Sequence, residues 1–208
     1  MKVVVSYISS LYDRRETILK ISETSADAIH ADLMDGKYAG EANFTISDPS
    51  AYIEEANFPV EFHLMTLKPS GYLNSLYSLN PTCIYIHPET EDNPKEILED
   101  IKNHDIEPAI VINPDEDISK YEYLYSYVGR VLLMSVVPGY GGQKFIEATT
   151  NRLDELLEYK RIYNFEIFID GGINSETIDK VLNADGVVSG SFICKSENYE
   201  ESIRKLKK

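Results

Sequence analysis

Short apolar runs recur along the chain at fairly even intervals, with polar stretches between them. Most of the runs are rich in Val, Ile, Tyr or Phe and are too short for helices, which is typical of buried parallel strands. We therefore predict strands at 3–8, 28–33, 60–65, 83–86, 109–112, 131–134, 165–169 and 186–188.

Helical periodicity appears in the polar stretches between these runs. Apolar residues with helical spacing predict helices through 96–101, 153–157 and 178–182. The first and the third of these segments follow Asn93-Pro94 and Asn174-Ser175-Glu176, which have the residue types that begin helices.

Strand and helix alternate along the whole chain, with no break rich in Gly, Pro or Ser. This pattern predicts a single α/β domain over residues 1–208. The length of 208 residues lies at the small end of the range for (β/α)8 TIM barrels, so this barrel is the predicted fold. An open doubly wound sheet is the alternative, because both architectures bury parallel strands on both faces.

Composition and charge narrow the choice of partners. Apolar residues make up 43 % of the chain and charged residues 26 %, which excludes wholesale disorder. The 20 basic and 35 acidic residues give a formal net charge of −15. Phosphodiester backbones and anionic lipids repel such a chain, so we expect neither a nucleic acid nor a membrane as partner.

Cysteine usage and hydropathy predict a cytoplasmic protein. Cys83 and Cys194 are too few for a disulfide framework and suit a reducing compartment. The apolar stretch near the N-terminus is too short for a signal peptide, and no run reaches the roughly 20 residues that span a bilayer.

Polar side chains interrupt three predicted strands near their carboxyl ends. His30 and Asp32 share one face of the second strand, His63 lies near the end of the third, and Asp170 follows the seventh. If the strands close into a barrel, these side chains can meet and form a site for a divalent metal ion, with Zn, Fe, Mn and Co equally suited. The alternative is that each caps a strand and is satisfied by the backbone.

Glycine-rich turns follow the last three predicted strands, at 138–143, 170–172 and 189–191. Glycine lets backbone N–H groups approach a ligand closely, and phosphate sites in such barrels are often built after strands seven and eight. The turns therefore predict a phosphate site made by the backbone, which an acidic chain can still provide. Ordinary turn chemistry is the alternative.

Other residues at strand ends admit two interpretations. Met34, Met65 and Met134 either fill the core or form an apolar floor that lines the active site. His87 ends the fourth strand and could lie behind the metal ligands or on the substrate side. We interpret the acidic run at 89–92 as a solvated loop.

Five segments together resemble the ribulose-phosphate 3-epimerase family, in the family's order and with similar separations. They are 30–36 (HADLMDG), 63–65 (HLM), 134–146 (MSVVPGYGGQKFI), 170–172 (DGG) and 190–191 (GS). The resemblance implies a (β/α)8 barrel, a divalent metal held by His30, Asp32, His63 and Asp170, and assembly into homo-oligomers. It further implies that Asp32 and Asp170 are the catalytic acid/base pair. The implied substrate contacts are Ser6, His63, Gly139, Tyr140, Gly141, Gly142, Gly171, Gly172, Gly190 and Ser191.

The reaction implied by this resemblance is epimerisation at C3 of a phosphorylated ketose. The expected substrate is D-ribulose 5-phosphate, converted to D-xylulose 5-phosphate in the pentose phosphate pathway through an enediolate, with one carboxylate on each side of the sugar. Two alternatives stay open: a D-allulose-6-phosphate 3-epimerase, which the run at 86–90 also resembles, and a catalytically silent phosphosugar-binding homologue. The segment 37–45 is longer than the family's usual stretch, and we expect it to determine which of the two sugar phosphates is the substrate.

Overall fold

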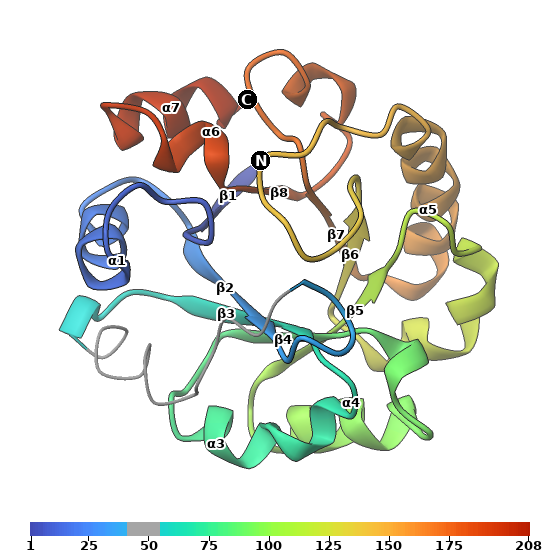
Figure 1. Cartoon of the computed structure of the whole chain (residues 1–208). Helices are drawn as coiled ribbons and strands as arrows, with labels where there is room; N and C mark the ends of the chain where they lie inside the picture. Colours follow the sequence, from blue (N-terminus) through green and yellow to red (C-terminus); the bar gives the residue numbers. More distant parts are fainter. Residues whose placement is uncertain (41–54) are drawn as a thin grey trace.

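The structure is a computed structural model that describes residues 1–40 and 55–208. Its strands form a closed parallel barrel in sequence order, which confirms the (β/α)8 barrel and excludes the open sheet (Figure 1). The strands are β1 (Lys2–Ser6), β2 (Ala28–Met34), β3 (Val60–Met65), β4 (Cys83–Ile86), β5 (Glu107–Ile112), β6 (Arg130–Met134), β7 (Glu166–Asp170) and β8 (Gly186–Ser189).

Helices surround the barrel on the outside (Figure 1). The α-helices are α1 (Arg14–Ser22), α3 (Leu73–Tyr77), α4 (Pro94–Asn103), α5 (Thr149–Tyr163), α6 (Ser191–Cys194) and α7 (Tyr199–Leu206). The 3-10 helices are η1 (Pro69–Gly71), η2 (Pro88–Thr90), η3 (Ile118–Tyr127) and η4 (Ile178–Lys180). The helices predicted at 96–101 and 153–157 lie within α4 and α5, and α4 begins at Pro94, as predicted.

The predicted helix at 178–182 is wrong, because the structure has only the single turn η4 there. The Asn174 side chain accepts hydrogen bonds from the backbone N–H groups of Glu176 and Thr177, which fixes a turn instead of a helix start. Val181 leaves the helical region with φ −127°, and β8 begins at Gly186. Of the three apolar residues that suggested a helix, Ile178 and Val181 are fully buried and Leu182 is exposed. The spacing therefore reflects the burial of two residues and not a helix.

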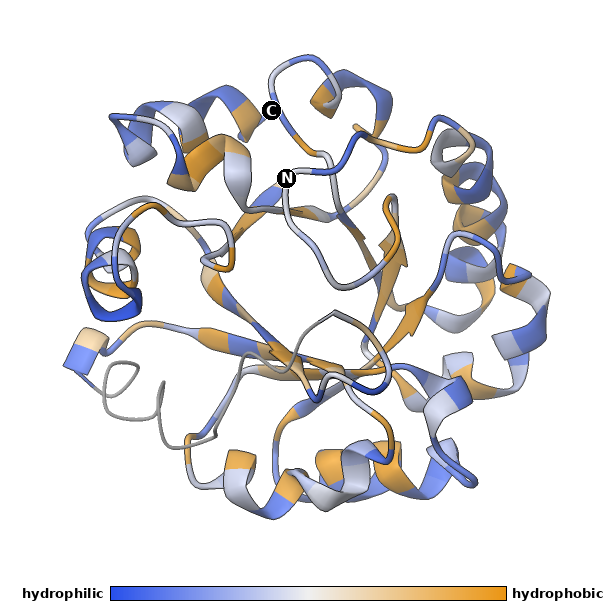
Figure 2. Ribbon diagram, in the orientation of Figure 1, coloured by the Kyte–Doolittle hydropathy of each residue, from blue (hydrophilic) through white to orange (hydrophobic). Residues whose placement is uncertain are grey.

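Two hydrophobic cores flank the barrel wall. The larger lies between the strands and the helices, and Figure 2 shows apolar segments next to hydrophilic ones along the helices. The smaller fills the barrel interior with residues such as Val4, Leu132 and Phe168. Packing on both faces explains why the strand sequences are nearly continuous in apolar residues and why the site lies at the end of the barrel.

Two expectations from the sequence can be compared only with the residues that the structure describes. The segment 37–45 extends into 41–54, so residues 41–45 lie outside the described residues. Within the described ranges, none of the helices combines the length and the apolar character needed to span a bilayer.

Candidate active site

Strand register brings the polar residues of β2 and β3 side by side. In the ladder between these strands His30 pairs with Glu61, and Asp32 pairs with His63. Because side chains alternate along a strand, all four belong to the set that faces the barrel interior. Asp170 is the last residue of β7, which stands across the ring from β3.

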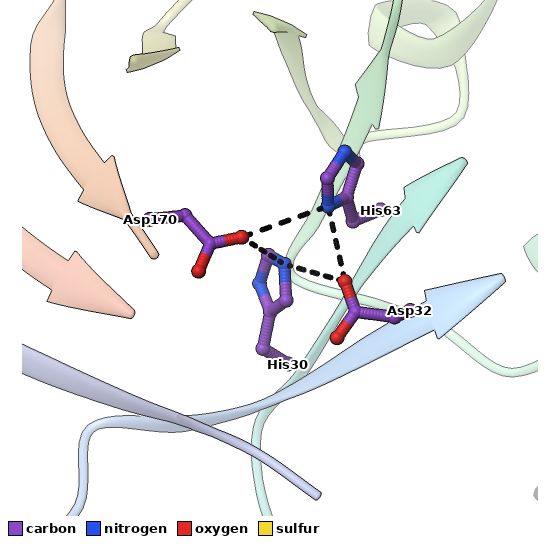
Figure 3. A group of neighbouring side chains, drawn as sticks. All are labelled: His30, Asp32, His63 and Asp170. Atoms are coloured by element: carbon purple, nitrogen blue, oxygen red, sulfur yellow. Dashed lines mark hydrogen bonds and ion pairs between the residues drawn. The ribbon is translucent and has the colours of Figure 1, made fainter. Parts of the chain in front are cut away.

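Four side chains converge at the carboxyl end of the barrel: His30, Asp32, His63 and Asp170. Each offers a nitrogen or oxygen atom within 4.8 Å of the atoms offered by the others. Asp32 Oδ1 lies 3.1 Å from His63 Nδ1 and 3.5 Å from His30 Nε2. Asp170 Oδ2 lies 3.9 Å and 4.0 Å from the same two nitrogens. Figure 3 shows the two carboxylates on either side of the His30 ring, with His63 next to Asp32.

This cluster fits a divalent metal ion. His30 Nε2 is buried and has no hydrogen-bond partner among the described residues, an arrangement that is unfavourable unless a ligand satisfies the nitrogen. The other ring nitrogen, His30 Nδ1, lies 2.8 Å from Glu61 Oε1, the kind of carboxylate contact that metal-ligating histidines make. Two imidazole nitrogens and two carboxylate oxygens suit divalent transition metals.

Burial and neighbouring charge give the two aspartates different acidities. Burial raises the pKa of Asp170 to about 7; the Asp32 and Glu61 carboxylates add to the shift, and His30 opposes it. Burial acts in the same direction on Asp32, but His30, His63 and the Ser6 hydroxyl together lower the pKa of Asp32 below its ordinary value. Ser6 Oγ donates to Asp32 Oδ2 at 2.6 Å. The two carboxyl groups therefore favour different protonation states.

The two histidines also differ. Burial lowers the pKa of His63 to about 4, and the neighbouring imidazoles contribute to this shift. Burial acts in the same sense on His30, but the carboxylates of Asp32, Glu61 and Asp170 outweigh it and raise the pKa of His30 to about 9. A cation that binds His30 must therefore displace a proton at neutral pH.

A cavity of about 350 Å³ opens at this end of the barrel, and Asp32 and Asp170 both line it. The cavity is also lined by nine of the residues expected to contact substrate: Ser6, Gly139, Tyr140, Gly141, Gly142, Gly171, Gly172, Gly190 and Ser191. Gly142 has φ +79°, a conformation that L side chains rarely adopt. A Cβ at Gly190 would lie 3.1 Å from the Ser6 carbonyl oxygen, so glycine allows this turn to pack closely against β1.

Two residues that were expected to contact substrate or line the site, His63 and Met34, do not line this cavity. His63 is fully buried and does not line it. Met65 and Met134 line it, whereas Met34 does not. The Met34 sulfur lies next to Gly40, 2.6 Å from the position that a Cβ on that glycine would take.

Sequence reasoning did not single out Glu61 and Lys195. Glu61 is 1 % exposed and hydrogen-bonds His30; its signal in the sequence is a charge inside an apolar strand, two positions before His63. Lys195 lines the cavity, with Nζ 3.9 Å from the position of a Cβ on Gly142. The salt bridges of the described residues include no carboxylate partner for Lys195, and no sequence motif marks it.

The expectation of a solvated loop at 89–92 is correct for Asp92 and wrong for Thr90, which is 7 % exposed, and for the Glu89 side chain. The side chain of Asp92 is 95 % exposed. The side chain of Glu89 is only 23 % exposed and accepts hydrogen bonds from the Tyr38 hydroxyl and the Asn113 amide. Asn113 and Tyr38 are distant from Glu89 in the sequence, so the acidic run alone could not reveal these contacts.

Comparison with known proteins identifies the family. The family model described as "Ribulose-phosphate 3 epimerase family" matches residues 2–194. The chain belongs to the ribulose-phosphate 3-epimerase family. The ribulose-phosphate 3-epimerase of Helicobacter pylori is 35 % identical over 210 residues, which cover 99 % of this chain and 96 % of that one. The enzyme of the same name from Aquifex aeolicus is 36 % identical over 186 residues, covering 88 % and 84 %. Membership in this family makes the chain an epimerase, an enzyme of the isomerase class.

Solved structures similar to this family member support the fold alone. A tryptophan synthase alpha-subunit from Pyrococcus furiosus superimposes with a TM-score of 0.73 at 17 % identity, covering 99 % of this chain and 96 % of that one. A 3-hexulose-6-phosphate synthase gives a TM-score of 0.69 at 16 % identity, covering 99 % and 98 %. Barrels of this kind host many reactions, so these similarities say nothing about substrate.

Proposed function

We propose that this epimerase interconverts D-ribulose 5-phosphate and D-xylulose 5-phosphate, with Asp32 and Asp170 as the two proton carriers. The observation that carries the proposal is the pair of carboxyl groups with different acidities, on either side of the His30 ring (Figure 3), that line one glycine-rich cavity. The names of the relatives from Helicobacter pylori and Aquifex aeolicus support this substrate.

Inversion at C3 requires a proton to leave one face of the sugar and another to arrive at the opposite face. In one direction Asp32, kept ionised by the imidazoles and by the Ser6 hydroxyl, accepts the C3 proton. Asp170, whose burial favours the protonated form, delivers a proton to the other face. The roles exchange in the reverse direction, as they must in a reversible epimerisation.

His30, Asp32, His63 and Asp170 would hold the divalent metal. When bound, the cation supplies positive charge that offsets the negative charge developing on the substrate oxygens. Ser6 keeps Asp32 oriented through its hydrogen bond to Oδ2, which leaves Oδ1 on the side of the imidazoles. The two histidines are fully buried, so solvent does not reach this side of the cluster.

The phosphate group would bind at the glycine-rich turns. Gly141, Gly142 and Gly190 present backbone rather than side chains to the cavity, so their N–H groups can approach an anion. The Lys195 ammonium group adds a positive charge at the same wall. This arrangement supports a phosphorylated sugar as substrate despite the net charge of −15.

Deuterium wash-in at C3 tests the proposed function. With D-ribulose 5-phosphate in D₂O, we expect deuterium at C3 of both epimers, loss of exchange on chelation, and recovery when Zn, Fe, Mn or Co is added back. A parallel reaction with D-allulose 6-phosphate distinguishes the hexulose alternative, which faster exchange into that sugar would establish. No exchange into either sugar by metal-loaded protein would identify a silent binding protein and refute the proposal.

A further inference from the structure

Behind His63 lies a row of hydrogen-bonded side chains that the proposed reaction does not use. His63 Nε2 lies 2.9 Å from His87 Nε2, and the two rings are inclined by only 23°. His87 Nδ1 lies 2.8 Å from the Tyr38 hydroxyl, which in turn lies 2.5 Å from Glu89 Oε1. The row therefore connects β3, the end of β4 and the turn after β2.

We propose that this row, from Glu89 through Tyr38 and His87, fixes His63 with the lone pair of Nδ1 facing the four-residue cluster. Tyr38 and His87 are then positioning residues of the metal site. The proposal rests on the metal-binding part of the proposed function, and it assigns a role to His87, which the sequence left between two interpretations.

Glu89, the carboxylate at the outer end of the row, determines which group donates in each hydrogen bond of the row. Glu89 also receives a hydrogen bond from the Asn113 amide at 2.8 Å, as expected of an ionised carboxylate that only accepts. The Tyr121 hydroxyl lies 3.2 Å from Glu89 and 2.6 Å from Glu116, and the two carboxylates share its one hydrogen. The single hydroxyl hydrogen of Tyr38 must therefore point to Glu89. Its oxygen is left to accept, and it does so from the Asn113 amide at 2.8 Å and from His87.

The same reasoning continues to the cluster. Because His87 donates through Nδ1, a neutral His87 has a lone pair on Nε2, and the hydrogen between the two imidazoles belongs to His63 Nε2. A neutral His63 then has its lone pair on Nδ1, the nitrogen that lies 3.1 Å from Asp32 Oδ1. In this tautomer the ring nitrogen and the carboxylate have no hydrogen between them, and a cation bound to both would take its place.

His30 is held through its other ring nitrogen, Nδ1, by a separate set of hydrogen bonds. Glu61 accepts hydrogen bonds from Arg130 and Tyr85, so the hydrogen in its 2.8 Å contact with His30 belongs to His30 Nδ1. His30 Nε2 therefore faces the cluster, where it has no hydrogen-bond partner among the described residues, and it offers a lone pair once a cation displaces its proton. Two separate networks thus orient the two histidines, one through Nδ1 and one through Nε2, before any metal binds.

Metal affinity is the readout that separates this role from a purely structural one. The test titrates the metal-free full-length protein with Co²⁺ against a chromophoric chelator. His87→Leu removes the acceptor for His63 Nε2–H and should weaken Co²⁺ binding by about 10–100-fold, the range for residues that orient ligands. His87→Gln, whose amide oxygen can accept the same hydrogen bond, should restore most of the affinity. Tyr38→Phe should weaken binding by about tenfold.

Tyr121→Phe is the matched control, because it also deletes a hydroxyl bonded to Glu89 but lies outside the row that leads to His63. We expect it to bind Co²⁺ as the unmodified protein does. The ¹⁵N spectrum of the metal-free protein should show His63 protonated at Nε2, and Tyr38→Phe should shift part of the population to the other tautomer. Unchanged Co²⁺ affinity in both Tyr38→Phe and His87→Leu, or a His63 protonated at Nδ1 in the unmodified protein, would overturn the proposal. Neither result would affect deuterium exchange by the unmodified enzyme, which tests the proposed function separately.

Discussion

The buried carboxyl group of Asp170 suits the proposed proton transfer but lowers the stability of the folded chain at high pH. Burial, with help from Asp32 and Glu61, raises the pKa of Asp170 from 3.8 to about 7. Between these pH values the folded chain binds more protons at this residue than the unfolded chain does. The contribution of Asp170 to stability is therefore greatest below pH 3.8 and is lost as the pH rises through about 7.

Asp170→Asn should therefore separate activity from stability. Losing a proton carrier should lower turnover by at least ~100-fold. In the metal-free protein the same change removes a carboxylate that is unfavourably buried at high pH, so Tm should rise more at pH 8 than at pH 5. Turnover assays and thermal unfolding of the metal-free variant at both pH values measure the two effects.

Asp92→Asn is the control for this change, because it makes the same substitution at a side chain that is 95 % exposed. It should leave turnover unchanged and change Tm little, because the Asp92 side chain lies in solvent. Near-normal turnover of Asp170→Asn would remove Asp170 from the mechanism. An equal gain in Tm at both pH values would contradict the raised pKa.

At the scale of the element, the turns after β6, β7 and β8 work together because each brings backbone to the same cavity. Gly190 is the N-cap residue of α6 and lies against β1, where a Cβ would be 3.1 Å from the Ser6 carbonyl oxygen. Gly190→Val should displace this turn and remove a backbone donor from the phosphate. A hydrogen bond to a charged group contributes about 1.5–3 kcal/mol, so KM for D-ribulose 5-phosphate should rise by about 10–100-fold.

Gly71→Val provides the comparison, since a Cβ at Gly71 would meet nothing within 4 Å and this residue does not line the cavity. Its KM should match that of the unmodified enzyme. Steady-state kinetics for both variants, with inorganic phosphate as competitive inhibitor, report on the phosphate site. An unchanged KM and an unchanged inhibition constant for Gly190→Val would place the phosphate elsewhere.

Elements with local causes could be predicted from the sequence, and contacts between distant segments could not. The strand pattern predicted β3 and β4 at their observed bounds, and the polar residues at strand ends predicted which four side chains meet. The spacing at 178–182 indicated burial but not helix, because the Asn174 turn and the early start of β8 leave no room for one. A charge inside an apolar strand marks Glu61 in the sequence, but its partner Arg130 lies 69 positions later, so the sequence pattern does not show the contact.

At the scale of the whole molecule, the barrel interior consists of three layers. Charged residues lie at one end, apolar residues in the middle and the candidate active site at the other end. At the amino-terminal end Arg130 contacts Glu61 at 2.7 Å, Glu107 at 3.0 Å and Glu166 at 3.4 Å. Apolar residues such as Leu132 and Phe168 fill the middle. Glu61 links the two ends, since Oε2 accepts from Arg130 and Oε1 contacts His30 of the cluster.

Arg130→Met should test this layering through stability. Arg130 is 8 % exposed and Glu61 1 % exposed, so the variant leaves a buried carboxylate without its cation, which typically destabilises a protein by about 3–5 kcal/mol. At roughly 2–4 °C per kcal/mol for a chain of this size, Tm should fall by about 6–20 °C. Arg161→Met removes an arginine whose ion pair with Glu158 is exposed, so Tm should change little. Adding Glu61→Gln to Arg130→Met should recover part of the loss, because the unpaired charge is then gone. An Arg130→Met variant as stable as the unmodified chain would show that Tyr85 and His30 alone satisfy the Glu61 carboxylate.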